Sequence, residues 1–199
     1  GLEMKLRALA AIGVTAILAV ACAGDGNRLT YTEHSSFYSP QLVQYVTKKG
    51  YFPVIMHGSP FGADGNSEIA QNLRLPGYYQ PVPFRDVSGQ SSADHGRLVL
   101  LMDASRIVNG DKLCGDLGKL ADSEGKSDKL QMQASFCYQD EMVSYTVLNT
   151  PRPNSAGDAS FQRAMRQLTE ELFRTQVPDG AASARLGASV SPFKFGFHC

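Results

Sequence analysis

The chain has no cluster of basic residues, and this absence argues against one broad class of function. Lysine and arginine total 19, aspartate and glutamate also total 19, and the formal net charge is zero. The longest basic run is the pair Lys48-Lys49. Proteins that bind nucleic acids gather lysine and arginine on one face to neutralise phosphates. We therefore expect no nucleic-acid partner.

The chain also lacks the short motifs that mark nucleotide, hydrolytic and metal sites. Gly58, Gly62 and Gly65 match neither the dinucleotide-binding fingerprint nor the P-loop, and Ser59 does not lie in a G-x-S-x-G context. No two histidines share helix or strand spacing, and the four are widely scattered: His34, His57, His95 and His198. The sequence accordingly predicts no catalytic residue, no metal and no cofactor.

What the chain does carry is an N-terminal pattern typical of an export signal. Two cations precede an uncharged run over residues 8–21, which ends in small residues before Cys22. The secretion machinery recognises such a pattern, and a signal peptidase then removes it. We predict a signal peptide over residues 1–21, and we interpret the three residues ahead of Met4 as an artificial extension or a misplaced start.

The end of this signal, Ala19-Val20-Ala21-Cys22, resembles the lipobox of bacterial lipoproteins. The resemblance covers only this segment, and it implies that the Cys22 thiol is acylated and becomes the mature N-terminus. It also implies a lipid-anchored membrane protein with a short tether over residues 22–27. Ala23, rather than aspartate, follows the cysteine, which is similar to outer-membrane lipoproteins. The implied location is the bacterial cell envelope, at the outer membrane facing the periplasm.

Two alternatives to the lipid anchor stay open. Ala19-Val20-Ala21 is also an A-x-A site for the ordinary signal peptidase, which would release a secreted soluble protein beginning at Cys22. The segment could instead stay uncleaved as a membrane anchor. Its uncharged run is borderline short for that role, because a spanning helix needs about 20 apolar residues.

The remaining cysteines predict a disulfide, because export places them in an oxidising compartment. Cys114 and Cys137 bracket a polar segment over residues 115–129 that lacks the apolar content to hold itself in place. Closing a loop of this size stabilises a fold by about 3 kcal/mol in the loop-entropy model. If Cys22 is acylated, Cys199 is left free or pairs with another molecule. If Cys22 is not acylated, four cysteines allow two bridges.

Hydrophobic periodicity predicts a single domain that mixes helices and strands. Alternating or continuous apolar runs indicate strands at residues 28–32, 51–56, 98–102, 130–138 and 142–148. Helices are indicated at 40–49, from 66 or 67 to just before Pro76, and at 160–174. The strand at 98–102 is expected to be central, and Pro81 and Pro83 indicate an extended, edge-like stretch. Asn109-Gly110-Asp111 indicates a turn.

The order of these elements predicts an α+β fold, with a mixed sheet of about five strands and two or three helices packed on it. We assign residues 28–177 to this domain and residues 178–199 to a tail. The tail is rich in alanine, glycine and serine and ends in an aromatic segment.

The most suggestive local feature is the loop predicted between the second strand and the second helix. Loops in this position often hold ligands, because helix N-termini present free backbone N–H groups. The loop alternates acidic and amide residues, as calcium-binding loops do. It does not match an EF-type loop, because the glycine and glutamate that such a loop requires are absent. The candidate ligand-binding residues are His57, Gly58, Ser59, Gly62, Asp64, Gly65 and Asn66.

The second candidate feature is the alternation of Phe193, Phe195 and Phe197 in the tail. These side chains could pack on the domain or meet a protein partner by strand addition. Our leading hypothesis is a non-enzymatic, membrane-anchored envelope lipoprotein that acts as a protein-interaction or assembly module. The alternatives are a secreted or anchored hydrolase and a periplasmic small-ligand carrier, each using the loop described above.

Overall fold

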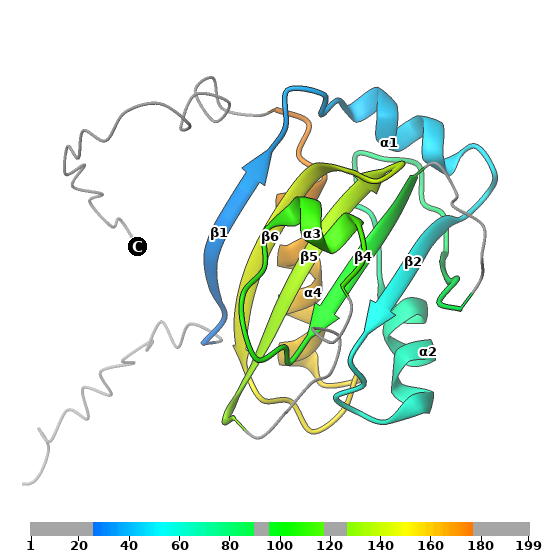
Figure 1. Ribbon diagram of the computed structural model, residues 1–199. Coiled ribbons are helices and arrows are strands. Elements are labelled where there is room, and N and C mark those ends of the chain that lie inside the picture. The colour runs from blue at the N-terminus through cyan, green and yellow to red at the C-terminus, as the bar shows by residue number, and fades with distance from the viewer. Residues whose placement is uncertain (1–25, 90–95, 118–126, 177–199) are drawn as a thin grey trace, which may run out of the picture.

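The computed structural model describes residues 26–89, 96–117 and 127–176 (Figure 1). The strands are β1 (Arg28–His34), β2 (Phe52–His57), β3 (Phe84–Asp86), β4 (Gly96–Met102), β5 (Lys129–Tyr138) and β6 (Glu141–Pro151). The helices are α1 (Pro40–Thr47), α2 (Ala63–Asn72), α3 (Gly110–Cys114) and α4 (Ala159–Leu172). The predicted α+β class is confirmed.

One mixed sheet contains all six strands, in the order β1-β6-β5-β4-β2-β3. β2 pairs in parallel with β3 and β4, and the other neighbours are antiparallel. β4 lies inside the sheet as predicted, and every one of its residues is buried because both sheet faces are covered. The sixth strand is β3, a three-residue edge strand that directly follows Pro83.

One face of the sheet, which we call the helical face, is covered by α1, α2 and α4. The helix α4, predicted at 160–174, buries one apolar stripe: Phe161, Ala164, Met165, Leu168 and Leu172. These residues share one core with Val43 of α1, Ile69 of α2 and the inward side chains of β2, β4 and β5. Burial of apolar area on this scale is the main force that holds the helices to the sheet.

The opposite face is covered by a shorter segment, residues 103–117, which we call the strap and which includes α3 (Figure 1). Its apolar residues Val108, Leu113 and Leu117 pack on Val99 and Leu101 of β4 in a second, smaller core. The disulfide between Cys114 and Cys137 ties the strap to β5. The predicted bridge is therefore present.

Two sequence expectations about helices were wrong in detail. α2 begins at Ala63, three or four residues earlier than predicted, so the candidate loop is partly helical. The physical reason is packing: the Phe61 ring lies against the Phe161 ring with centroids 5.2 Å apart, which draws the chain to the sheet before Asn66. α3 was expected as a turn, but the Asn109 side chain accepts from the Lys112 amide and starts a five-residue helix.

Candidate functional site

The predicted loop lies where the parallel strands β2 and β4 end. His57 is the last residue of β2 and pairs with Leu101 of β4. The next residue, Gly58, has a φ of +83°, and a Cβ there would lie 2.3 Å from the Met102 carbonyl oxygen. Only glycine fits such an approach. This close approach holds the ends of β2 and β4 side by side. The carboxyl ends of parallel strands are the usual place for a ligand in an open sheet.

Hydrogen bonds from the Asn66 side chain tie the two parts of the loop together. The Asn66 side-chain amide donates to the Gly58 carbonyl at 3.4 Å and to the Ser59 hydroxyl at 3.2 Å. The Asn66 Oδ1 atom is buried without a hydrogen-bond partner. Asp64 is exposed, whereas Gly65 is buried against Phe61. The loop residues thus mainly organise the start of α2.

The pKa of His57 is shifted at this end of the sheet. Burial lowers its pKa from the ordinary value, so the imidazole is neutral at pH 7. A neutral imidazole can accept a proton or bind a metal. Among the described residues, however, no group of three or more histidine, cysteine, aspartate or glutamate side chains is placed to hold a metal ion.

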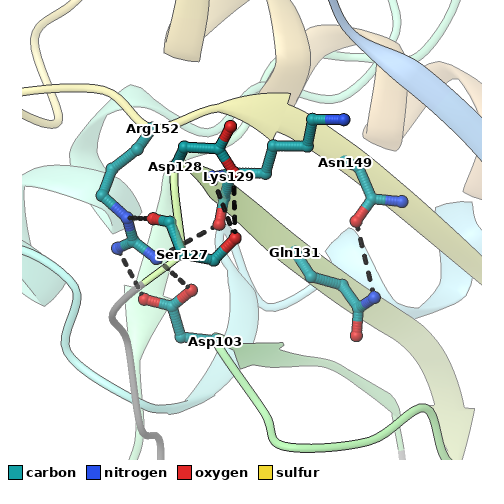
Figure 2. Close-up of polar contacts among 7 residues, drawn as sticks. All are labelled: Asp103, Ser127, Asp128, Lys129, Gln131, Asn149 and Arg152. Atoms are coloured by element: carbon teal, nitrogen blue, oxygen red, sulfur yellow. Dashed lines mark hydrogen bonds and ion pairs between the residues drawn. The ribbon is translucent and has the colours of Figure 1, made fainter.

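An ion pair follows β4 at the same end of the sheet. Asp103 adopts a φ of +58° and its carboxylate is nearly buried. The Arg152 guanidinium donates to both carboxylate oxygens, at 2.8 and 2.7 Å (Figure 2). The guanidinium also donates to the Ser127 and Lys129 carbonyls. The hydrogen bonds to Asp103 raise the pKa of Arg152. The charges of Asp103 and Arg152 balance each other, and every guanidinium nitrogen donates a hydrogen bond. The pair therefore joins β4, β5 and β6 at this end of the sheet.

The opposite end of the sheet contains a groove of about 350 Å³, which we call the hairpin groove. It is lined by Phe37, Leu42, Tyr138, Gln139, Glu141, Met142 and Val143. Five of these seven side chains are apolar or aromatic. Phe37 is 70% exposed, the largest exposed fraction among the large apolar side chains of the described residues. A concave surface with an exposed phenylalanine at its edge is suited to an apolar side chain of a partner.

The backbone of the β5–β6 hairpin builds one wall of the groove. A register shift opposite Phe136 and Cys137 leaves Val143 as an extra residue in β6. The extra residue places the consecutive side chains of Val143 and Ser144 on the helical face, while Met142 packs in the strap core. Met142 and Val143 both line the groove from this strand end.

The turn between β1 and α1 builds the other wall. The Ser35 amide donates to the Val143 carbonyl at 2.9 Å, which fixes the turn to the hairpin. The Ser39 hydroxyl then accepts from the Leu42 amide at 3.2 Å and caps α1, with Pro40 in its first turn as predicted. Phe37 and Leu42 are thereby held opposite the hairpin.

The carboxyl end of α4 lies beside this groove, where hydroxyl groups satisfy its last carbonyls. Ser144 donates to the Leu172 carbonyl at 2.8 Å, Tyr78 to the Phe173 carbonyl at 2.9 Å, and Tyr38 to the Arg174 carbonyl. Ser144 and Tyr38 are chain neighbours of the groove residues Val143 and Phe37. The chain thus leaves α4 next to the hairpin groove.

The remaining predicted site residues lie outside the described part of the chain. These are Cys22, predicted to carry the lipid, and the three aromatic residues Phe193, Phe195 and Phe197. Within the described ranges, no helix is long and apolar enough to cross a membrane.

Comparisons with protein-family models, with curated proteins and with solved structures find no match to this chain.

Sequence reasoning missed the hairpin groove entirely. Its two walls come from residues 37–42 and 138–143, about a hundred positions apart, and are brought together by pairing of β1 with β6. The available signal was the exposed Phe37 within a polar turn, next to serines and followed by a helix cap. That signal does not indicate what the phenylalanine would face.

Proposed function

We propose that this protein is an exported envelope lipoprotein, anchored through Cys22, whose folded domain binds a protein partner in the hairpin groove. The groove with its exposed Phe37 is the observation that carries the proposal. Aromatic side chains next to a depression are typical centres of binding energy in protein interfaces. The domain in this view acts by binding and assembly rather than by catalysis.

Two further features support an envelope location. The N-terminal pattern matches an export signal with a lipobox-like end, and the disulfide of Cys114 with Cys137 suits an oxidising compartment. The anchor has a direct test. We expect the full chain to incorporate labelled palmitate in a bacterial host and the Cys22→Ser variant to incorporate none. Equal labelling of both proteins would refute the anchor.

Photo-crosslinking in intact cells tests the binding function. A photoreactive phenylalanine analogue placed at Phe37 is expected to give a discrete adduct with another protein. The same analogue at Ile107 is the matched control, because Ile107 is 57% exposed but lies on the strap, away from the groove. Adducts that are absent at Phe37, or identical at both positions, would contradict the proposal.

Substitution of Phe37 measures how much the groove contributes. Phe37→Ala is expected to weaken capture of the crosslinked partner about tenfold, which corresponds to the loss of one strong aromatic contact. Its effect on folding is expected to be within about 0.5 kcal/mol, because the side chain is exposed. Unchanged capture by Phe37→Ala would show that the partner binds elsewhere.

The second candidate function is small-ligand binding at the His57 end. It is favoured by the neutral, half-buried imidazole at the carboxyl ends of β2 and β4. In that case His57→Gln would abolish ligand binding or hydrolytic activity and leave the Phe37 adduct unchanged. A partner adduct at Phe37, with no ligand binding or hydrolysis that depends on His57, favours the groove.

A further inference from the structure

The chain leaves the described domain beside the hairpin groove. The Arg174 carbonyl accepts from Tyr38, the neighbour of Phe37, and the Leu172 carbonyl accepts from Ser144, the neighbour of Val143. The described residues end only two positions after Arg174. Whatever follows in the sequence therefore begins close to the groove.

The sequence that follows contains apolar side chains of the kind that the groove would accept. Phe193, Phe195 and Phe197 alternate with small or polar residues, and the stretch before them is rich in alanine, glycine and serine. Seventeen positions separate Gln176 from Phe193. A coil of that length spans about 20–25 Å, and the same chain fully extended reaches about 55 Å. Reach therefore does not prevent contact with a groove at the point of exit.

We propose that the segment containing Phe193, Phe195 and Phe197 occupies the hairpin groove of its own chain and competes there with the protein partner. The inference rests on the proposed function in one respect, since it assigns regulation to the same groove. The segment acts as an internal competitor. A partner must displace it before the groove can bind the partner's own side chain.

A weak contact is sufficient for this role because the segment is tethered. A covalent connection of this length gives an effective concentration on the order of millimolar. A segment with a dissociation constant in the same range would fill the groove about half of the time. Partner affinity would then fall about twofold, in proportion to the fraction of open groove. Tighter contact of the segment would give a larger reduction.

Crosslinking of the purified full chain, kept in detergent and without partner, tests occupancy. The photoreactive analogue at Phe37 is expected to crosslink to the peptide that contains Phe193, Phe195 and Phe197. The analogue at Ile107 is the control and is expected to give no such product. A Cys199→Ser background prevents mixed disulfides from confusing the result.

Isotope labelling separates contact within one chain from contact between chains. An equal mixture of light and heavy protein is expected to give light–light and heavy–heavy products. Products of mixed mass would show that the segment of a second copy fills the groove, which overturns the proposal. Crosslinks to other parts of the chain, such as β1 at the open edge of the sheet, would overturn it as well.

A variant of the segment tests competition in cells. Replacement of Phe193, Phe195 and Phe197 by alanine is expected to raise the partner adduct at Phe37 at least about twofold. The matched control replaces Leu186 and Val190 by alanine, which removes apolar side chains outside the alternating pattern, and it is expected to leave the adduct unchanged. An unchanged adduct in the triple variant, or an equal rise in the control, would overturn the competition.

The two proposals fail in different ways. If the proposed function is wrong, no partner adduct forms at Phe37 in any variant, whereas the crosslink within the purified chain still forms. If the competition is wrong, the partner adduct forms at the same level with and without the three phenylalanines.

Discussion

The two faces of the sheet are held by different kinds of interaction. On the helical face, three helices bury large apolar side chains, and the Phe52 ring lies among those of Phe84, Phe136 and Phe173 at centroid distances of 5.1, 5.7 and 5.3 Å. On the other face, the strap contains a single helix of five residues. It is tied down by the disulfide and by buried polar side chains of the sheet.

Buried side chains of the sheet hold the strap through hydrogen bonds to its backbone. The Gln133 side chain is fully buried, accepts from the Val108 amide at 2.9 Å and donates to the Arg106 carbonyl at 2.9 Å. The Tyr145 hydroxyl donates to the Val108 carbonyl at 2.6 Å, and Arg97 donates to the Cys114 carbonyl at 2.7 Å. A segment too short to bury much apolar area is here held by directional bonds and a covalent link.

The largest expected effect comes from the helical face. Phe52→Ala should lower the free energy of unfolding by about 3–5 kcal/mol, because it leaves a cavity among three other aromatic rings. Urea unfolding measures the change. Phe37→Ala is the matched control, since it makes the same truncation at an exposed site and should cost no more than about 0.5 kcal/mol. Equal losses in the two variants would mean that burial does not govern this face.

The disulfide should give the next largest effect, and the strap should show most of it. The alanine double variant, Cys114→Ala with Cys137→Ala, should lower the free energy of unfolding by about 3 kcal/mol, since the bridge closes a loop of 23 residues. Hydrogen exchange should show a larger loss of protection at the amides of Val108 and Leu113, which also open locally, than in α4. A uniform loss over both faces would contradict the proposed difference between them.

Removal of the buried amide should cost somewhat less. Gln133→Leu should lower the free energy of unfolding by about 1–3 kcal/mol, because the buried Val108 amide loses the acceptor of its hydrogen bond. Gln131→Leu is the matched control: its half-buried side chain donates to Asn149 at 3.4 Å (Figure 2) and accepts from Gln133 at 3.3 Å, and its loss leaves the bonds of Gln133 to Val108 and Arg106 in place. A cost for Gln131→Leu as large as that for Gln133→Leu would argue against the buried network.

The smallest effect is a pH dependence that comes from His34, the last residue of β1, which lies beside the end of α4. Burial, and then the Arg174 charge, lower the pKa of His34, against smaller opposing effects of the Glu171 and Leu172 carbonyls and the Glu171 carboxylate. Tyr38 packs edge-on against its ring, with centroids 4.7 Å apart. The unfolded chain binds a proton at this histidine more readily than the folded chain does. The free energy of unfolding therefore has its full value above about pH 6.5 and falls as the pH drops below that value.

Unfolding titrations between pH 7.5 and pH 5 measure this dependence. One such group contributes a slope of at most about 1.4 kcal/mol per pH unit. His34→Phe should remove more of the slope than His57→Gln, since burial lowers the pKa of both histidines but His34 is only 5% exposed. A slope that His34→Phe leaves unchanged would show that other groups cause it.

The fold was predictable wherever local pattern and packing agree. The apolar stripe from Phe161 to Leu172, the continuous run Leu98-Val99-Leu100-Leu101-Met102 and the capped start of α1 each formed the expected element. Pairing of Cys114 with Cys137 also followed from the weak composition of the segment between them. The start of α2 did not follow, because a contact of Phe61 with the distant Phe161 decides it.

The candidate sites were less predictable than the fold. The glycine loop was visible in sequence, but only the approach of Gly58 to Met102 shows why glycine is needed there. The buried polar groups Gln133 and Arg97 gave no sequence signal, because a glutamine or arginine in a strand is ordinarily taken as exposed.

By itself, the sequence determined the class of the fold, the main helices and strands and the disulfide. Each of these depends on residues close together in the chain or on simple composition, so periodicity and spacing are enough. The tertiary structure alone decided the strap and the hairpin groove. The strap is held by side chains of β5 and β6, and the groove joins two segments far apart in sequence that meet only because β1 pairs with β6 and Ser35 bonds Val143. Pairing at that separation is set by the packing of the whole sheet, which no local pattern records.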